Sequence, residues 1–231
     1  MAFGANRWVA ISGRFDATNV AAWSTDGITW SSTTLPASVR WTEVTFGANL
    51  FVVVGYGGNV AYSTNGATWT LGATPEARTL GTVLYGGDRF VTLGYFNNPN
   101  YGAHSTNGIT WSSFTFPGAN DSNVSSLAYG AGRFVASIPY TRSVIHSTNG
   151  ITWSENTLAF PNNTTQWDVA FTGNRFLGMA QNQNTTLIST DGITWTNSGA
   201  NILPNNSALR KPSYGDFTVA CLLYTSDAAD E

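Results

Sequence analysis

The sequence predicts an all-β fold built from repeated four-stranded antiparallel sheets, and three observations lead to this prediction. A seven-residue motif, Ser-Thr-Asx-Gly-x-Thr-Trp, occurs five times in the 231 residues. Its copies begin 39, 42, 42 and 42 residues apart, and each interval contains several short β-prone runs. A nearly fixed period of this length, filled with strands, is typical of a β-propeller in which each repeat forms one blade. We therefore expect about five blades.

Each motif predicts a tight hairpin between the last two strands of a blade. Asx-Gly between β-prone runs is a strong hairpin signal, and its glycine is expected to adopt the positive φ of a two-residue turn. The serine and Asx side chains are expected to hydrogen-bond the turn, and the tryptophan to pack over it. The predicted structural residues are Ser24, Asp26, Gly27, Trp30, Ser63, Asn65, Gly66, Trp69, Ser105, Asn107, Gly108, Trp111, Ser147, Asn149, Gly150, Trp153, Ser189, Asp191, Gly192 and Trp195. Since the same residue types recur five times, we assign them one structural role and neither catalysis nor metal binding.

Together the five copies resemble Asp-box repeats, also called BNR repeats, whose usual pattern is Ser-x-Asp-x-Gly-x-Thr-Trp. Each copy here is one residue shorter between the acid and the glycine, and three of the five carry Asn in place of Asp. The resemblance covers roughly residues 1–200 and implies a propeller scaffold. It implies no single activity, because similar repeats occur in sialidases, sortilin-type receptors, photosystem assembly factors and many phage or bacterial surface proteins.

The second period shows the four strands that we expect in every blade. Residues 41–46 alternate between apolar and polar side chains, which predicts a half-buried strand. Residues 50–54 are continuously apolar, as in a strand buried on both faces. Residues 60–63 and 68–71 flank the Asn-Gly turn and complete the sheet. The other periods align with this order.

The two ends of the chain predict incomplete blades. Residues 1–3 keep only the end of a first strand, whereas 209–214 and 217–220 look like the first two strands of a sixth unit. Segment 209–214 either completes the first blade and closes a five-bladed ring, or belongs to an open arc with two free edges. We favour a compact, ring-like fragment of a larger parent. We predict one domain over residues 1–220, truncated at both ends.

The last eleven residues, 221–231, break the repeat pattern abruptly. They resemble a translated stretch of the adapter used in transposase-based sequencing libraries, so we expect a non-native tail. This segment carries Cys221, the only cysteine, so the remaining sequence gives no indication of disulfides. It also carries the three acids that give the formal net charge of −3.

The composition excludes several classes of partner. Only 10% of the residues are charged and no run of like charge occurs, which argues against nucleic-acid binding. No apolar stretch approaches the roughly 20 residues of a membrane-spanning helix, so we expect no membrane insertion. His104 and His146 share one repeat position and are expected to pack, so neither a metal nor a cofactor is predicted. The uncharged surface, rich in Asn, Thr and Gly, favours an extracellular or virion-associated location.

We expect ligand binding on the face of the propeller that carries the variable loops. In a four-stranded meander the first and third turns share one face, and the second turn and the blade-to-blade connections share the other. Here the first pair repeats and the second pair varies, and binding residues concentrate where a rigid scaffold presents variable loops. The candidate ligand-binding residues are Tyr56, Tyr95, Phe96, Tyr101, Tyr140 and Arg142. Aromatic rings beside amides and hydroxyls suit a carbohydrate or a protein ligand.

The sequence gives little support for an enzyme, and we predict that the chain is not one. A sialidase would need an arginine cluster and an Arg-Ile-Pro signature, and that signature is absent. Glu43 lies on a predicted innermost strand where a catalytic acid could sit, but other repeats have Thr82, Ser126, and Asp168 or its neighbour at that position. We favour a non-catalytic binding or structural module that faces a glycan or receptor. The alternatives are a sialidase-like glycoside hydrolase and a scaffold for protein assembly.

Overall fold

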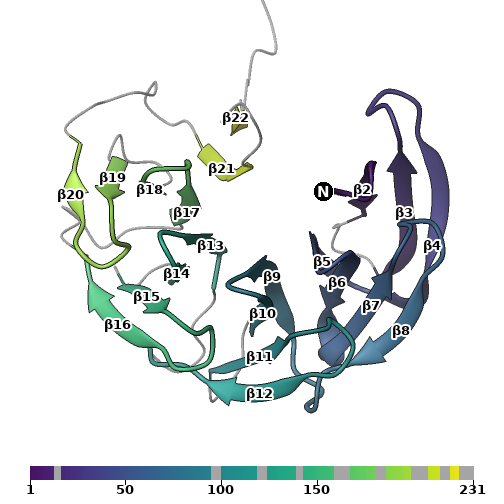
Figure 1. Ribbon diagram of the computed structural model, residues 1–231, viewed down its shortest axis with the longest axis horizontal. Helices are drawn as coiled ribbons and strands as arrows, with labels where there is room; N and C mark the ends of the chain where they lie inside the picture. The colour runs from purple at the N-terminus through teal and green to yellow at the C-terminus, as the bar shows by residue number, and fades with distance from the viewer. Residues whose placement is uncertain are drawn as a thin grey trace, which may run out of the picture.

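The computed structural model describes residues 1–12, 17–94, 100–118, 124–138, 143–158, 167–180 and 186–198, and the backbone of 208–213 and 219–223. Five four-stranded antiparallel sheets follow one another along the described chain, each built from four consecutive strands. They lie side by side around an arc, with the first strand of each sheet innermost and the fourth outermost (Figure 1). The all-β class and the five propeller blades predicted from the sequence are therefore confirmed.

Each blade uses four strands in sequence order. Blade 1 contains β1 (Ala2–Gly4), β2 (Arg7–Ile11), β3 (Thr18–Ser24) and β4 (Ser31–Val39). Blade 2 contains β5 (Trp41–Gly47), β6 (Leu50–Gly55), β7 (Asn59–Ser63) and β8 (Thr70–Ala73), with the 3-10 turn η1 (Tyr56–Gly58) between β6 and β7. Blade 3 contains β9 (Leu80–Gly86), β10 (Arg89–Gly94), β11 (Tyr101–Ser105) and β12 (Ser112–Thr115). Blade 4 contains β13 (Ser126–Gly130), β14 (Arg133–Ile138), β15 (Ser143–Ser147) and β16 (Ser154–Thr157). Blade 5 contains β17 (Trp167–Phe171), β18 (Phe176–Ala180), β19 (Thr186–Ser189) and β20 (Thr196–Asn197).

In blades 1 to 4 the two-residue turns occur at the first connection rather than at the third. Between β5 and β6, Gly47 pairs with Leu50, and the two intervening residues Ala48 and Asn49 have φ of 46° and 57°. Two successive positive φ values define the type I′ turn that matches the twist of a hairpin. The third connection is wider, because β3 ends at residue 24 and β4 begins at residue 31. The predicted two-residue turn at Asx-Gly is thus wrong, although each of the five glycines has the expected positive φ.

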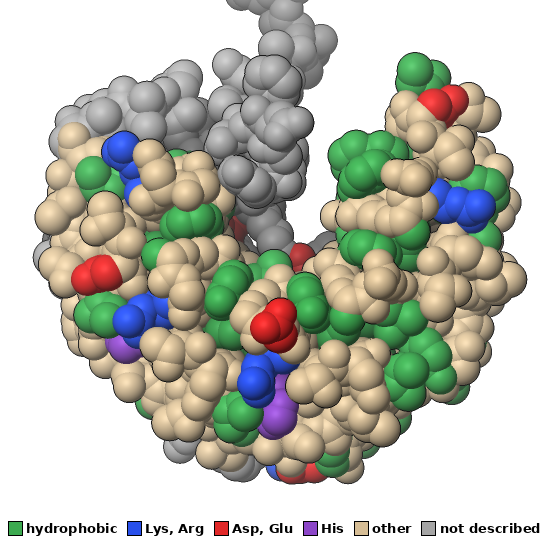
Figure 2. Space-filling view, viewed as in Figure 1, with side chains coloured by type: hydrophobic (Ala, Val, Ile, Leu, Met, Phe, Trp, Pro, Cys, Tyr) green, Lys and Arg blue, Asp and Glu red, His purple; other side chains and the backbone are tan. Residues whose placement is uncertain are grey.

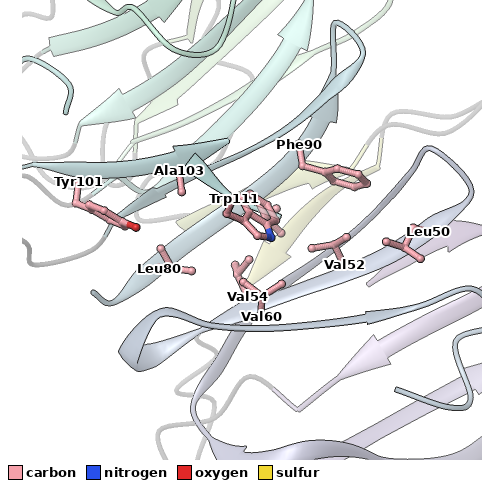
Figure 3. Packing of buried hydrophobic residues seen from close by; sticks show 10 residues of the cluster. Leu50, Val52, Val54, Val60, Leu80, Phe90, Tyr101, Ala103 and Trp111 are labelled. Carbon is pink, nitrogen blue, oxygen red and sulfur yellow. The ribbon is translucent and has the colours of Figure 1, made fainter. Parts of the chain in front are cut away.

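The hydrophobic core lies between neighbouring blades. One cluster joins Leu50 and Val52 of blade 2 to Leu80, Phe90 and Trp111 of blade 3 (Figure 3). The same kind of cluster forms at each of the other three blade boundaries. Each blade therefore buries its apolar face only against the next one, as in other repeat proteins.

A glycine at the end of the first strand receives an aromatic ring from the following blade. A Cβ atom added at Gly47 would fall within the Tyr85 ring, far inside the 3.0 Å that real Cβ atoms keep. Only glycine allows so close an approach. The same contact recurs as Gly4 with Phe46, Gly86 with Tyr129 and Gly130 with Phe171. In blades 2 to 5 that ring also packs against a second-strand phenylalanine of its own blade, at centroid distances of 4.6–4.8 Å.

The predicted sixth unit is present as a two-stranded sheet, β21 (Ala208–Ser213) paired with β22 (Val219–Leu223). Strand β21 lies beside β17 of blade 5 and does not belong to the sheet of blade 1. The described blades form an open arc, so the ring-like arrangement that we favoured is wrong (Figure 1). Strand β22 includes residues 221–223 of the expected tail, and the division into residues 1–220 and 221–231 stays a prediction.

Candidate binding site on the variable-loop face

The repeated loops of the third connection use their polar side chains to hold their own backbone. In the first loop the Ser24 hydroxyl donates to Asp26 Oδ1 at 2.9 Å and accepts the Gly27 N–H at 2.8 Å. Asp26 Oδ1 also accepts the N–H groups of Ile28 and Thr29, at 2.8 and 2.7 Å. These bonds tie residue 24 to residue 27 and residue 26 to residues 28 and 29, which explains why the loop is wider than a two-residue turn.

The other four loops repeat this network. The serine hydroxyl lies 2.9–3.1 Å from the Asx oxygen and 2.8 Å from the glycine nitrogen in each of them. Asn and Asp interchange because the loop needs one acceptor oxygen and not a negative charge. Where the residue is Asp26, backbone N–H groups of residues 28 and 29 hold the pKa of its carboxyl far below the ordinary value. These serine and Asx oxygens therefore act as scaffold.

Different hydrogen bonds join neighbouring blades on the two faces of the arc. On one face the Arg7 guanidinium, next to the first turn of blade 1, donates to the Asn65 carbonyl in the repeated loop of blade 2 at 2.9 Å. On the other face the second connection of blade 2 meets the blade-to-blade connections. The Tyr56 N–H donates to the Arg40 carbonyl at 3.0 Å, and the Gly58 N–H donates to the Arg78 carbonyl at 2.6 Å. Variable loops and blade connections thus lie together, opposite the repeated loops.

Two pairs of side chains extend from the connections whose backbones meet here, and we call Arg40, Tyr56, Glu76 and Arg78 the Tyr56 cluster. The Arg40 guanidinium donates to the Tyr56 hydroxyl at 2.7 Å and lies 4.8 Å from the centre of its ring. The Arg78 Nε lies 3.3 Å from a Glu76 carboxylate oxygen, and these two side chains are 35% and 48% exposed. The cluster offers a partly exposed aromatic ring held by an arginine, and a partly exposed ion pair on the next connection.

The structure places the six predicted ligand-binding residues differently. Tyr56 lies in η1, on the face where we expected it. Tyr101 begins strand β11 and is only 2% exposed, inside the core between blades 2 and 3, where burial raises the pKa of its phenol (Figure 3). Tyr95, Phe96, Tyr140 and Arg142 lie outside the described residues. The ligand role of all six stays a prediction.

Sequence reasoning did not select Arg40, Glu76 or Arg78 as site residues. All three belong to the connections between blades, whose variable length already marked them as candidate binding loops. Their contacts with η1 could not be inferred, because a connection and the second turn of a blade are far apart within one repeat. The available sequence signal for these three residues was only that they lie in the connections between blades.

Polar residues of the innermost strands link neighbouring blades. The Glu43 carboxylate accepts bonds from the Thr82 hydroxyl and from the Val83 N–H, the latter at 3.0 Å. The Ser126 hydroxyl accepts the Val169 N–H at 2.6 Å at the equivalent boundary between blades 4 and 5. Glu43 therefore bridges two blades through the position that we considered for a catalytic acid.

The two histidines pack beside arginines of the neighbouring strand. His146 Nδ1 lies 3.3 Å from the Arg133 guanidinium, and burial followed by the Arg133 charge lowers its pKa. Burial and the Arg89 charge lower the pKa of His104 in the same way. Among the described residues, no three His, Cys, Asp or Glu side chains are placed to hold a metal ion. In the same part of the chain, no helix has the length and apolarity needed to span a bilayer.

Comparison with known proteins shows the fold and no more. No family model and no curated protein matches the sequence. A streptogramin B lyase structure matches with a TM-score of 0.74 at 14% identity, over 90% of this chain and 70% of that one. YCF48 from Cyanidioschyzon merolae matches with a TM-score of 0.67 at 15% identity, over 93% and 75%. YCF48 bound to D1 peptide matches with a TM-score of 0.64 at 14% identity, over 86% and 66%. The β-propeller is shown, whereas membership of the Asp-box family stays a prediction.

These neighbours contradict the prediction that the chain is not an enzyme. They include a catalytically inactive virginiamycin B lyase from Staphylococcus aureus with quinupristin, with a TM-score of 0.72 at 14% identity, over 86% and 68% of the two chains. Since lyases share this architecture, a missing sialidase signature argues only against a sialidase. It gives no ground for excluding other enzymes.

Proposed function

We propose that this chain is a binding propeller whose variable-loop face holds an extended segment of a partner protein. The observation that carries the proposal is the Tyr56 cluster, in which a ring and charged side chains meet on one face. The opposite face is formed by loops whose serine and Asx oxygens already bond their own backbone. The repeated-loop face therefore uses these oxygens to hold its own backbone, which leaves the variable-loop face as the candidate binding surface.

The chemistry of the Tyr56 cluster suits a peptide. Tyrosine and arginine are the side chains that most often dominate binding energy at protein interfaces. The Arg40 contact already fixes the Tyr56 ring, so less side-chain freedom is lost when a ligand arrives. The Glu76–Arg78 pair adds both charge signs within one connection, which can select a segment with complementary side chains.

The neighbours favour a protein ligand over the carbohydrate that we also considered. The YCF48 structure bound to D1 peptide shows that a propeller of similar shape takes a peptide. The specific form that we propose is a scaffold that gathers partner proteins during assembly, with its repeated loops as Asp-box-type supports. Glycan binding is then the competing outcome.

An immobilised library of random 15-residue peptides tests the proposal with the intact chain. We expect a subset of peptides to be captured, and Tyr56→Ala or Arg78→Ala to weaken that capture about tenfold or more. Tyr56→Phe keeps the ring but loses the Arg40 hydrogen bond, so its effect should be smaller. Ile109→Ser is the matched control, because Ile109 is 45% exposed on a repeated loop of the other face.

Two results would contradict the proposal. One is capture that Tyr56→Ala and Arg78→Ala leave unchanged, since the peptide would then bind elsewhere. The other is a chain that captures no peptide but binds members of a glycan array, because the ligand would then be a carbohydrate.

A further inference from the structure

Blade 1 exposes the apolar face that the other four blades bury. Its second-strand aromatic residue, Trp8, is 36% exposed, whereas the equivalent Phe51 and Phe90 are 0% exposed. Phe3 and Trp30 are also exposed, at 52% and 38%. Exposed apolar patches of this kind on a folded protein mark interaction sites.

The four boundaries between blades 1 and 5 show what kind of surface covers the equivalent face of the other blades. At each boundary between described blades, an aromatic residue near the end of the first strand packs on a glycine of the preceding blade, as Phe46 packs on Gly4. The loop glycine of the same blade faces a second-strand valine of the preceding blade, as Gly66 faces Val9. In blade 1, by contrast, the described atoms within 4 Å of a Cβ added at Gly27 belong to Trp8 of the same blade. The covering surface is therefore a strand pair that offers one glycine and one valine.

We propose that the exposed face of blade 1, formed by Phe3, Trp8, Ile28 and Trp30, binds a second copy of this chain. The face continues the interface that already joins blades 1 to 5, so the partner that fits it is another blade of the same repeat. The arc has two ends, and the unit β21–β22 stands at the other one (Figure 1). One copy can thus present its β21–β22 end to the blade 1 face of the next.

The geometry favours this head-to-tail contact over two blade 1 faces meeting each other. Two such faces would bring aromatic rings against aromatic rings, and neither would supply the glycine on which a ring rests elsewhere. A head-to-tail contact uses two different surfaces. Charge does not oppose it, because the four residues of the face are uncharged. The space-filling view shows hydrophobic side chains on the blade 1 arm beside the opening of the arc (Figure 2).

Light scattering after size-exclusion chromatography, over a hundredfold range of protein concentration, tests the proposal with the full chain. We expect the wild-type mass to rise above the monomer value of 24.7 kDa as concentration increases. Phe3→Glu and Ile28→Glu should each weaken the association about tenfold or more, because a charge would enter an apolar contact. Ile109→Glu is the matched control, since Ile109 has the same repeat position as Ile28 but lies in blade 3.

The outcomes decide the proposal independently of peptide binding, since the two surfaces share no residue. Association that is lost in Phe3→Glu and Ile28→Glu but kept in Ile109→Glu supports it. A wild-type chain that stays monomeric over the whole range overturns it, as does association that both variants leave unchanged. Circular dichroism and the melting temperature of each variant show that the blades remain folded, and Ile28→Glu, at a side chain 85% exposed, keeps the test valid if Phe3→Glu unfolds.

Discussion

Replacing Gly47 with alanine places a methyl group where the Tyr85 ring of the next blade now lies. The ring must retreat by roughly an ångström or more before ordinary contact is restored, and such overpacking typically costs about 1–3 kcal/mol. Retreat is difficult, because Tyr85 packs on Phe90 at 4.7 Å and Phe90 is completely buried. We expect Gly47→Ala to lower the free energy of unfolding by about 3 kcal/mol, at the upper end of that range.

The loss can be measured by urea unfolding followed by tryptophan fluorescence, and by the melting temperature. In a domain of this size 3 kcal/mol corresponds to a fall of roughly 6–12 °C. Gly132→Ala is the control, because φ is +70° there and a Cβ would meet no atom of the described residues within 4 Å. That change carries only the backbone strain of a left-handed residue, about 1–2 kcal/mol.

A double-mutant cycle isolates the steric cause. Tyr85→Ala removes the ring with which the new methyl group collides, so Gly47→Ala should cost little in that background. If Gly47→Ala costs less than Gly132→Ala, or if its cost is the same with and without the Tyr85 ring, the close packing of blades on these glycines is not what holds them together.

Three further changes have expected results that follow from single positions. Ala48→Gly should raise the free energy of unfolding by up to about 1 kcal/mol in thermal melts, since glycine relieves the strain of a left-handed alanine. Asp26→Asn should flatten the fall in stability below about pH 5. The pKa of Asp26 is lower in the folded chain than in the unfolded chain, so its charged form adds stability above the pKa of the unfolded chain and this stability is lost as the pH falls. His146→Gln should flatten the fall between about pH 7 and 5, because burial and Arg133 lower the pKa of His146 despite the nearby Asp191, so protonation opposes folding as the pH drops.

Each of these three has a result that would count against its reason. A glycine at residue 48 that destabilises the protein would mean that the left-handed alanine is not strained. A urea midpoint of Asp26→Asn that falls between pH 5 and 2 as steeply as that of the wild type would mean that the hydrogen bonds of Asp26 do not discriminate between its charged and neutral forms. A steeper pH dependence for His146→Gln would reverse the assigned sign.

The fold could be predicted because its main determinant is a period along the chain. Five motifs at nearly equal spacing require five similar units, and the alternating and continuous apolar runs between them place four strands in each. The turn types were harder, since they depend on which groups bond. Asx-Gly is compatible with a two-residue turn, but the Ser24 and Asp26 side chains instead bond a wider loop. The two-residue turns lie at the first connection instead, and the one in blade 2 holds Ala48 and Asn49, neither of which is the glycine that signals such a turn.

The candidate site could be predicted only as a face. Variable loop length correctly indicated the side of the arc on which Tyr56 and the connections meet. It did not distinguish Tyr56 from Tyr101. Both residues follow the second strand of their blade, at nearly the same position of the repeat. Only the three-dimensional structure shows that the Tyr56 ring is held by Arg40 at the surface and that the Tyr101 ring is buried between blades. Whether the blades close into a ring could not be predicted either, because it depends on whether β21 pairs with blade 1, which is distant in the sequence.

Hydrogen–deuterium exchange of the intact chain, with and without a captured peptide, tests the proposed function most directly. We expect slower exchange at residues 40, 56–59 and 74–78, where the connections meet, and unchanged exchange in the repeated loop at residues 24–30. Protection confined to the repeated loops would contradict it, because those loops would then be the binding surface and not the scaffold.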